Sequence, residues 1–335
     1  MKISRLSACV VLRVLIPFVA YTLNPIGLNA LEFRQGLIRL SINETTGRFS
    51  LYYLTDPSQD RYEPLFAQED PRTSFLAVNV DSRVYRLGEN PVFTIRLEKN
   101  QATPAIIFES SFLRVRQEFS FIKTPSSLET NGVKITVRLE NKDSRQSRVG
   151  MRMLIDTNLG EGFGENHFVT DTQVITAETI VTGDTGDRWW VSQNSRLSLM
   201  GSIFAGVDTQ PDFLHFANWK RLNDLPWKVG YTQGRNFNYL PYSMGDSAVC
   251  YYYEPAPLPS GETTSHSIFL AVEDPAGFGF KAVISPEQRE ADLTLMRDLM
   301  IRLDQFLAGE ISMSREELAD MERTIAQIKA RYELL

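Results

Sequence analysis

The chain has 335 residues, of which 43% are hydrophobic and 23% are charged. This composition is typical of a folded globular protein and excludes a largely disordered chain or one made of membrane spans. The formal net charge is −6. Nucleic acid is therefore not expected as a partner, because phosphate binding needs a basic face.

The first 30 residues have the pattern of a secretory signal. Lys2 and Arg5 form a basic start, residues 14–23 are largely apolar, and the segment ends with the small residue Ala30. The apolar run is shorter than the roughly 20 residues that a membrane-spanning helix needs. We therefore expect a signal peptide at residues 1–30 and an exported, periplasmic protein, with a retained N-terminal anchor as the alternative.

Most of the remaining chain alternates apolar and polar residues, the period of β-strands. The alternation predicts strands at 37–43, 48–54, 73–86, 92–97, 106–122, 133–140, 149–155, 174–181, 197–207, 247–253 and 264–272. Residues 44–47 predict a hairpin between the first two strands, and Pro255, Pro257 and Pro259 are expected to break the chain after the strand at 247–253. Strands at this spacing favour a large antiparallel β-sandwich over residues 31–284.

An acidic, glycine-rich loop at residues 156–171 follows two predicted core strands and is the first candidate ligand site. Its polar side chains are those of Asp156, Glu161, Glu165, Asn166, His167 and Asp171. Calcium takes six to eight oxygen ligands, but the spacing is not that of an EF-hand, so no cofactor is predicted and calcium stays open as an alternative. Glycosidase chemistry would pair Glu161 with Glu165 or Asp171. The plain structural alternative is a solvated loop.

Two adjacent tryptophans, Trp189 and Trp190, follow the polar turn at residues 183–187. This position favours exposure, and an exposed indole can stack on the apolar face of a sugar ring. They are therefore candidate ligand residues, beside the basic and aromatic residues at 219–239, and burial in the core is the alternative. The irregular aromatic stretch at 208–245 is expected to cover one face of a sheet.

No sequence motif for nucleophilic catalysis or nucleotide binding is present. The chain lacks a Gly-x-Ser-x-Gly elbow, a Walker loop and a dinucleotide fingerprint, and its three histidines lack zinc spacing. After signal removal Cys250 would be the one cysteine left, so an internal disulfide is excluded, and its apolar strand predicts an unreactive thiol.

Two phrases carry a resemblance to a known family. Residues 149–160, VGMRMLIDTNLG, and residues 246–262, DSAVCYYYEPAPLPSGE, resemble exported bacterial sandwiches of the galactose-mutarotase-like, or supersandwich, type. The resemblance implies a sandwich of about 240 residues in a family that includes sugar epimerases, accessory domains of lyases and hydrolases, and many proteins of unknown role. The family's epimerases place an Asn-His pair followed by aromatic residues in the active site, and Asn166-His167-Phe168 matches the first part of that pattern. No C-terminal glutamate of the family pattern can be assigned.

The last 51 residues, 285–335, change to a helical period and predict a hairpin of two amphipathic helices. Ser285-Pro286 and Ser314 with Glu317 provide helix starts, and Gly309 separates the two segments. The second helix repeats apolar residues with coiled-coil spacing, namely Leu318, Met321, Ile325, Ile328, Tyr332 and Leu335. The first five of these are the predicted partner-binding residues, for a second copy, another protein or the sandwich of the same chain.

Together these patterns predict a non-enzymatic binding or assembly protein of the cell envelope, with an envelope glycan or protein as partner and a helical tail for docking or oligomerisation. The alternative is a carbohydrate-active enzyme, an epimerase or glycosidase, that uses the loop at 156–171. An enzyme would require His167 and a carboxylate to converge.

Overall fold

The computed structural model describes residues 30–67, 72–157, 159–161, 167–204, 210–241, 243–279 and 286–333. Its strands form three antiparallel sheets. The expected signal peptide lies outside the described residues, apart from Ala30.

The four-stranded sheet has the order β1 (Ala30–Gln35), β2 (Ile38–Asn43), β3 (Phe49–Asp56), β4 (Arg61–Pro64). The nine-stranded sheet has the order β13 (Val174–Ile175), β12 (Phe168–Thr170), β15 (Trp189–Gln193), β16 (Ser198–Ser202), β19 (Thr263–Ala271), β10 (Gly132–Asn141), β9 (Leu113–Ile122), β8 (Ala105–Glu109), β7 (Thr94–Glu98). The six-stranded sheet has the order β14 (Thr179–Val181), β17 (Phe213–Asn218), β18 (Ser247–Leu258), β11 (Ser147–Asp156), β5 (Phe75–Val80), β6 (Arg83–Arg86). Short 3-10 turns lie at Pro57–Gln59 and Gly183–Thr185, and the α-helices are α1 (Trp219–Asp224), α2 (Pro286–Leu307) and α3 (Arg315–Glu333).

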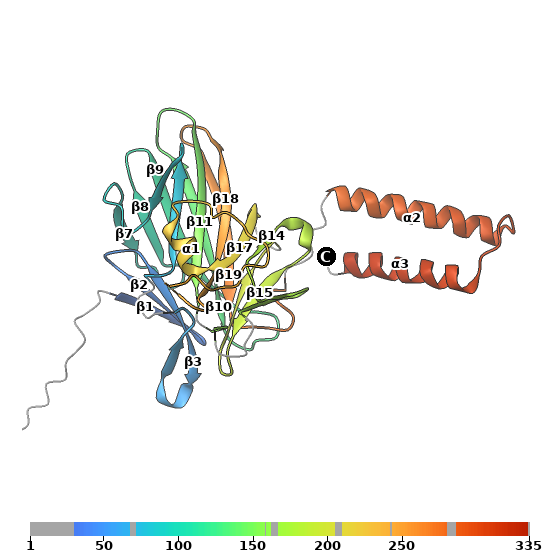
Figure 1. Cartoon of the computed structure of the whole chain (residues 1–335), viewed down its shortest axis with the longest axis horizontal. Coiled ribbons are helices and arrows are strands. Elements are labelled where there is room, and N and C mark those ends of the chain that lie inside the picture. The colour runs from blue at the N-terminus through green and yellow to red at the C-terminus, as the bar shows by residue number, and fades with distance from the viewer. Residues whose placement is uncertain are drawn as a thin grey trace, which may run out of the picture.

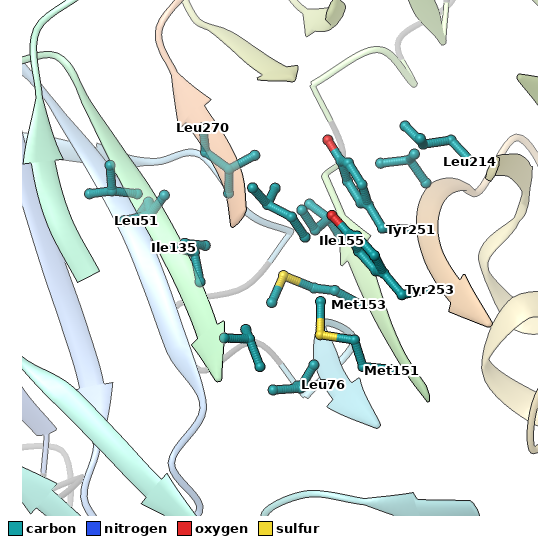
Figure 2. Packing of buried hydrophobic residues seen from close by; sticks show 14 of the residues in the cluster. Leu51, Leu76, Ile135, Met151, Met153, Ile155, Leu214, Tyr251, Tyr253 and Leu270 are labelled. Carbon is teal, nitrogen blue, oxygen red and sulfur yellow. The ribbon is translucent and has the colours of Figure 1, made fainter. Parts of the chain in front are cut away.

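The large core lies between the nine-stranded and six-stranded sheets, and the four-stranded sheet adds its buried face to it. Ile135 of β10 and Leu270 of β19 face Met153 of β11 and Tyr251 of β18 across this core, with Leu51 of β3 at its side (Figure 2). The strands alternate because one face of each meets this apolar layer. The predicted antiparallel β-sandwich is therefore confirmed.

Strand β18 continues through two prolines that were predicted to break it. Its last residues pair with β11 but not with β17, which is hydrogen-bonded only as far as Tyr252. A proline without an N–H is tolerated where a strand lacks a neighbour on that side. The pairing shifts register near Gly150, where a Cβ atom would lie 2.6 Å from the nitrogen of Pro255. The expected break at Pro255 and Pro257 is thus wrong, because β18 continues through a bulge of its own, in which Glu254 and Pro255 lie opposite Gly150.

Some strands of the structure have only a weak alternating pattern in the sequence. Strands β1, β4, β12, β15 and β17 were not predicted, β12 because it lies in the expected loop at 156–171, and the strand expected at 174–181 is interrupted between β13 and β14. Each of these strands is short or lies beside irregular sequence, so its partner strand rather than its own alternation defines it.

The aromatic stretch after β17 covers the outer face of the six-stranded sheet, as expected. Leu222 of α1 and Val229 are buried against Cys250 and Tyr252 of β18, and α1 lies over this sheet in Figure 1. The buried Arg152 of β11 donates hydrogen bonds to three main-chain carbonyls of the stretch, those of residues 222, 225 and 227, at 2.7 to 3.1 Å. Strands β11 and β18, at the centre of the six-stranded sheet, are therefore buried on both faces.

Helices α2 and α3 form the predicted C-terminal hairpin, which extends away from the sandwich (Figure 1). The capping box is present: Glu317 N donates to Ser314 Oγ at 3.2 Å, and Ser314 N donates to Glu317 Oε2 at 2.8 Å. Gly309 follows α2 with φ 71°, the left-handed conformation that suits glycine at a helix end. Among the described helices, none combines the length and apolar character needed to cross a membrane.

Candidate functional site

Three carboxyl groups meet where β11 ends and β18 begins. Because Asp156 pairs with Ala248 in an antiparallel register, the last residue of β11 lies beside the residues that lead into β18. One carboxylate oxygen from each of Asp156, Glu161 and Asp246 lies within 4.8 Å of the others. We call these three residues the acidic cluster. The register of the two central strands therefore builds this site.

Ser247 joins the acidic cluster to a histidine. Its main-chain N–H donates to Glu161 Oε1 at 2.6 Å, and its hydroxyl donates to the same oxygen at 3.3 Å. His167 Nδ1 lies 3.0 Å from the same hydroxyl oxygen. When the hydroxyl donates to Glu161, Nδ1 must carry the proton and donate to the hydroxyl, which leaves Nε2 as an acceptor. The His167 ring also packs against Phe237, with 4.5 Å between ring centroids.

The surroundings favour the protonated forms of these carboxyls. Burial raises the pKa of Asp156 to about 7, and the charge of Asp246 acts in the same direction. Burial likewise raises the pKa of Glu161 to about 8, although the Ser247 N–H opposes the shift, and the neighbouring carboxylates add to it. The pKa of Asp246 is raised and that of His167 is lowered, both by burial. Near neutral pH the cluster therefore offers both proton-donating and proton-accepting oxygens.

The structure brings together only some of the predicted ligand residues. Asp156, Glu161 and His167 converge, whereas Asp171 binds the main-chain N and the Nε of Arg188 at 2.8 and 2.7 Å. Glu165 and Asn166 lie outside the described residues. The predicted pair of Glu161 with Glu165 therefore stays a prediction. Asp171 is paired with Arg188, and within the described residues the carboxyl group of Glu161 lies with those of Asp156 and Asp246.

The expectation of an exposed Trp190 is wrong. Its side chain is 0% exposed, and its indole Nε1 donates to the hydroxyl of Tyr251 at 2.7 Å. The ring lies directly over Gly201, where a Cβ atom would come within 2.3 Å of it. Trp189 points to the opposite face of β15 and is partly exposed, with the Arg188 guanidinium 4.3 Å from its ring centroid. Trp190 belongs to the core and cannot stack on a ligand.

Asp246 and Ser247 were missed as site residues. Both belong to the phrase at 246–262, where the alternation predicts a strand at 247–253 and no ligand site. The available signal was positional: a polar pair just before a strand that neighbours β11 must lie close to the polar residue that ends β11. Without the pairing of β11 with β18, which the sequence does not show, that signal could not be used.

The carboxylate oxygens of the acidic cluster are the kind of ligand that a hard cation such as calcium prefers. The described residues supply three such side chains, fewer than the six to eight oxygens of a calcium shell. No metal role follows from the cluster alone. Cys250 is fully buried, and burial raises the pKa of its thiol to about 11, as expected for an unreactive cysteine.

Comparison with known proteins gives likeness at the level of structure only. No protein-family model matches the chain, and no curated protein matches its sequence. Three solved structures resemble it: a candidate aldose 1-epimerase from Escherichia coli K12 (9% identity, 74% of this chain and 99% of that chain, TM-score 0.48), a galactose mutarotase related enzyme from Lactobacillus acidophilus (8%, 73% and 97%, 0.44), and a GalM/aldose epimerase homologue from C. elegans (8%, 73% and 98%, 0.43). All three have the type of fold that the sequence was expected to resemble, and at these identities no activity is carried over to this chain.

Proposed function

We propose that this protein is an exported binding protein of the cell envelope that holds a carbohydrate at the acidic cluster and uses its helical hairpin for assembly. The observation that carries the binding proposal is the convergence of Asp156, Glu161 and Asp246 with Ser247 and His167. A sugar presents many hydroxyl groups, each a donor and an acceptor. A cluster of partly protonated carboxyls, a hydroxyl and an imidazole complements them in both roles.

The charge of the site argues against other common ligands. Ionised carboxylates repel phosphate and nucleic acid, whereas a neutral polyol has no charge to repel. Burial also matters, because a hydrogen bond to a poorly solvated carboxylate discriminates strongly between a ligand that makes it and one that does not. Asp156 is only 5% exposed, so a ligand hydroxyl that reached it would replace little water.

The binding proposal is tested by titrating envelope glycans and their component sugars into the purified protein by calorimetry. At a pH above about 8, where Glu161 is ionised, Glu161→Gln should weaken binding about tenfold or more, which is roughly the 1.4 kcal/mol of one charge-assisted hydrogen bond. Asp171→Asn is the matched control, because Asp171 is paired with Arg188 outside the cluster. Equal affinity in the wild type, Glu161→Gln and Asp246→Asn proteins would remove the cluster as the binding site.

Catalysis is a second candidate, because His167 and a carboxyl do converge. A group with a pKa near the working pH is suited to proton transfer, and the pKa of Glu161 is raised to about 8. Epimerase-type proton transfer fits this geometry better than glycoside hydrolysis. The clustered oxygens lie within 4.8 Å of one another, closer than the roughly 5 to 9.5 Å between carboxyls that flank a glycosidic bond.

The catalytic candidate has its own readout. Proton NMR on freshly dissolved aldoses would show whether the protein speeds the interconversion of anomers, and His167→Ala with Glu161→Gln would abolish that effect. Binding without any acceleration in the wild type would leave the non-enzymatic role standing.

The hairpin supports the assembly part of the proposal. Met321 and Ile328 of the predicted partner-binding stripe are buried, and the hairpin extends from the sandwich (Figure 1). These two residues of the α3 stripe are therefore engaged within the hairpin. The docking surface that we propose consists of the apolar residues of both helices that stay exposed.

A further inference from the structure

Helix α2 carries an exposed apolar row along most of its length. Leu293, Met300 and Leu307 are 61%, 60% and 73% exposed, and Leu303 is 37% exposed. Together with the partly exposed Met296 they follow the alternating spacing of three and four residues that forms a helix-pairing seam. We call these five residues the α2 seam. Such a continuous row of large apolar side chains is rare on a protein surface without a partner.

The α2 seam is a different face from the one that α3 covers. The residues of α2 that lie against the hairpin interior are Asp292 and Leu299, which are buried, and Phe306, which is partly buried. Each precedes a seam residue by one position, and one position is a rotation of about 100° around the helix. The seam therefore faces roughly a right angle away from α3, the direction in which a four-helix bundle places its next helix.

Helix α3 contributes to the same open side. Leu318 and Ile325 are partly exposed, whereas Met321 and Ile328 of the same stripe are buried. Since the two helices run in opposite directions, helical geometry places Leu318 and Ile325 on the side of the hairpin towards which the seam faces. The hairpin thus offers one apolar side built by both helices, with most of the exposed area on α2.

We infer that this side pairs with the same side of a second copy, so that two hairpins form a four-helix bundle in which the two α2 helices run antiparallel about a two-fold axis. This inference rests on the assembly role proposed for the hairpin and names its partner. The sandwich of the same chain is not the occupant, because the hairpin extends away from it (Figure 1).

Charge complementarity favours a second copy over an unrelated protein. Arg297 and Asp304 are exposed and lie seven residues apart, in one row that borders the seam on the side away from α3. In an antiparallel pair the like rows of two helices meet, so Arg297 of each copy faces Asp304 of the other. The seam is therefore self-complementary under two-fold symmetry. A parallel pair would instead bring this row against the row of Leu299, which α3 already occupies.

The first test is the mass of the whole chain in solution by sedimentation equilibrium over a range of concentrations. We expect a dimer. Met300→Glu, which places a charge in the middle of the seam, should raise the dimer dissociation constant about a hundredfold. Ile301→Glu is the matched control: Ile301 is 50% exposed and lies next to Met300 but off the seam, so its effect should stay within about threefold. A wild-type monomer at about 100 µM, or a dimer that Met300→Glu leaves intact, would overturn the inference.

The second test is a charge swap, which also reports the direction of pairing. Arg297→Glu and Asp304→Arg should each weaken the dimer about tenfold, because each creates two like-charge contacts. The double variant restores both pairs and should return to within about threefold of the wild type. A double variant as weak as the single ones would exclude antiparallel pairing. Circular dichroism of each variant confirms that the hairpin is folded. Glycan titration of the same variants distinguishes failure of this inference from failure of the binding proposal, because the acidic cluster is on the sandwich.

Discussion

Replacing Glu161 by glutamine should stabilise the protein in mildly alkaline solution. Glutamine has the shape of the protonated glutamic acid, and its Oε1 can still accept the Ser247 N–H bond. The substitution therefore keeps the contacts of the neutral side chain and removes only the ability to ionise. A site residue whose removal increases stability is expected where function, not folding, requires a charge.

The sign follows from proton linkage. The pKa of Glu161 is about 8 in the folded protein, above the ordinary value of 4.5, and that of Asp156 is about 7, above 3.8. Between about pH 4 and pH 8 the folded state thus holds protons that the unfolded state has lost, so stability falls as the pH rises through this window. The penalty is absent below the unfolded pKa values and complete above the folded ones.

The magnitude follows from the same shifts. At about 1.4 kcal/mol per pKa unit, a rise of roughly 3.5 units for Glu161 corresponds to about 5 kcal/mol at alkaline pH. When Glu161 is neutral, the pKa of Asp156 falls part of the way back towards its ordinary value, since the two charges repel each other. We expect Glu161→Gln to be about 3 to 5 kcal/mol more stable than the wild type near pH 8.5, and within about 0.5 kcal/mol of it near pH 4.

The assay is urea denaturation at several pH values in EDTA, because a divalent cation on the carboxylates would lower their pKa values. Asp274→Asn is a control of opposite sign. Although burial opposes ionisation there, hydrogen bonds from Thr124 and from the main-chain nitrogens of Ala276 and Ser126 hold the pKa of Asp274 below its usual value. That variant should lose stability at neutral pH and lose less as the pH falls. If the Glu161→Gln difference were independent of pH, Glu161 would be well solvated and the basis of the site would fail.

Three further substitutions probe the core, the sheet cover and the hairpin. Trp190→Ala should cost about 3 to 5 kcal/mol in denaturant unfolding, because a fully buried indole is lost; a cost below about 1 kcal/mol would return Trp190 to the surface. Arg152→Met should leave the carbonyls of residues 222 and 225 without this donor and that of residue 227 with the Tyr252 hydroxyl alone, and cleavage by a protease between residues 219 and 229 should then precede global unfolding. Ile328→Asp should remove the helical circular dichroism of the hairpin while the sandwich unfolds at its usual temperature, unless the hairpin is part of the sandwich core.

The sandwich could be predicted because its strands face one continuous core. Val133 to Leu139 and Val149 to Ile155 place an apolar residue at every second position, and these residues are buried where they were expected. What the alternation could not show is the second buried face of β11 and β18. That face depends on Arg152 and the aromatic stretch, which lie some 70 residues apart along the chain. The alternation of residues within a strand shows that one of its faces is buried, whereas burial of both faces depends on residues far away in the sequence.

The tryptophan pair shows an inference that the sequence did permit. Neighbouring residues in a strand point to opposite faces, so Trp189 and Trp190 could not both belong to one exposed shelf once they were placed in a strand. The polar turn before them suggested exposure for both. The pairing of β15 between β12 and β16 decides which of the two faces the core, and that pairing is a property of the sheet.

The hairpin separates two properties that the sequence pattern treats as one. The regular spacing from Leu318 to Ile328 predicts that one face of α3 needs a helical partner, and it finds that partner in α2 of its own chain. The stripe with the most regular spacing is thus already packed within the hairpin. Helix α2 is apolar over a wider arc, because it bears both the row that meets α3 and the α2 seam. Because this apolar arc is wider than one neighbour can cover, we expect a second neighbour on the face left open after folding and not on the most regular stripe.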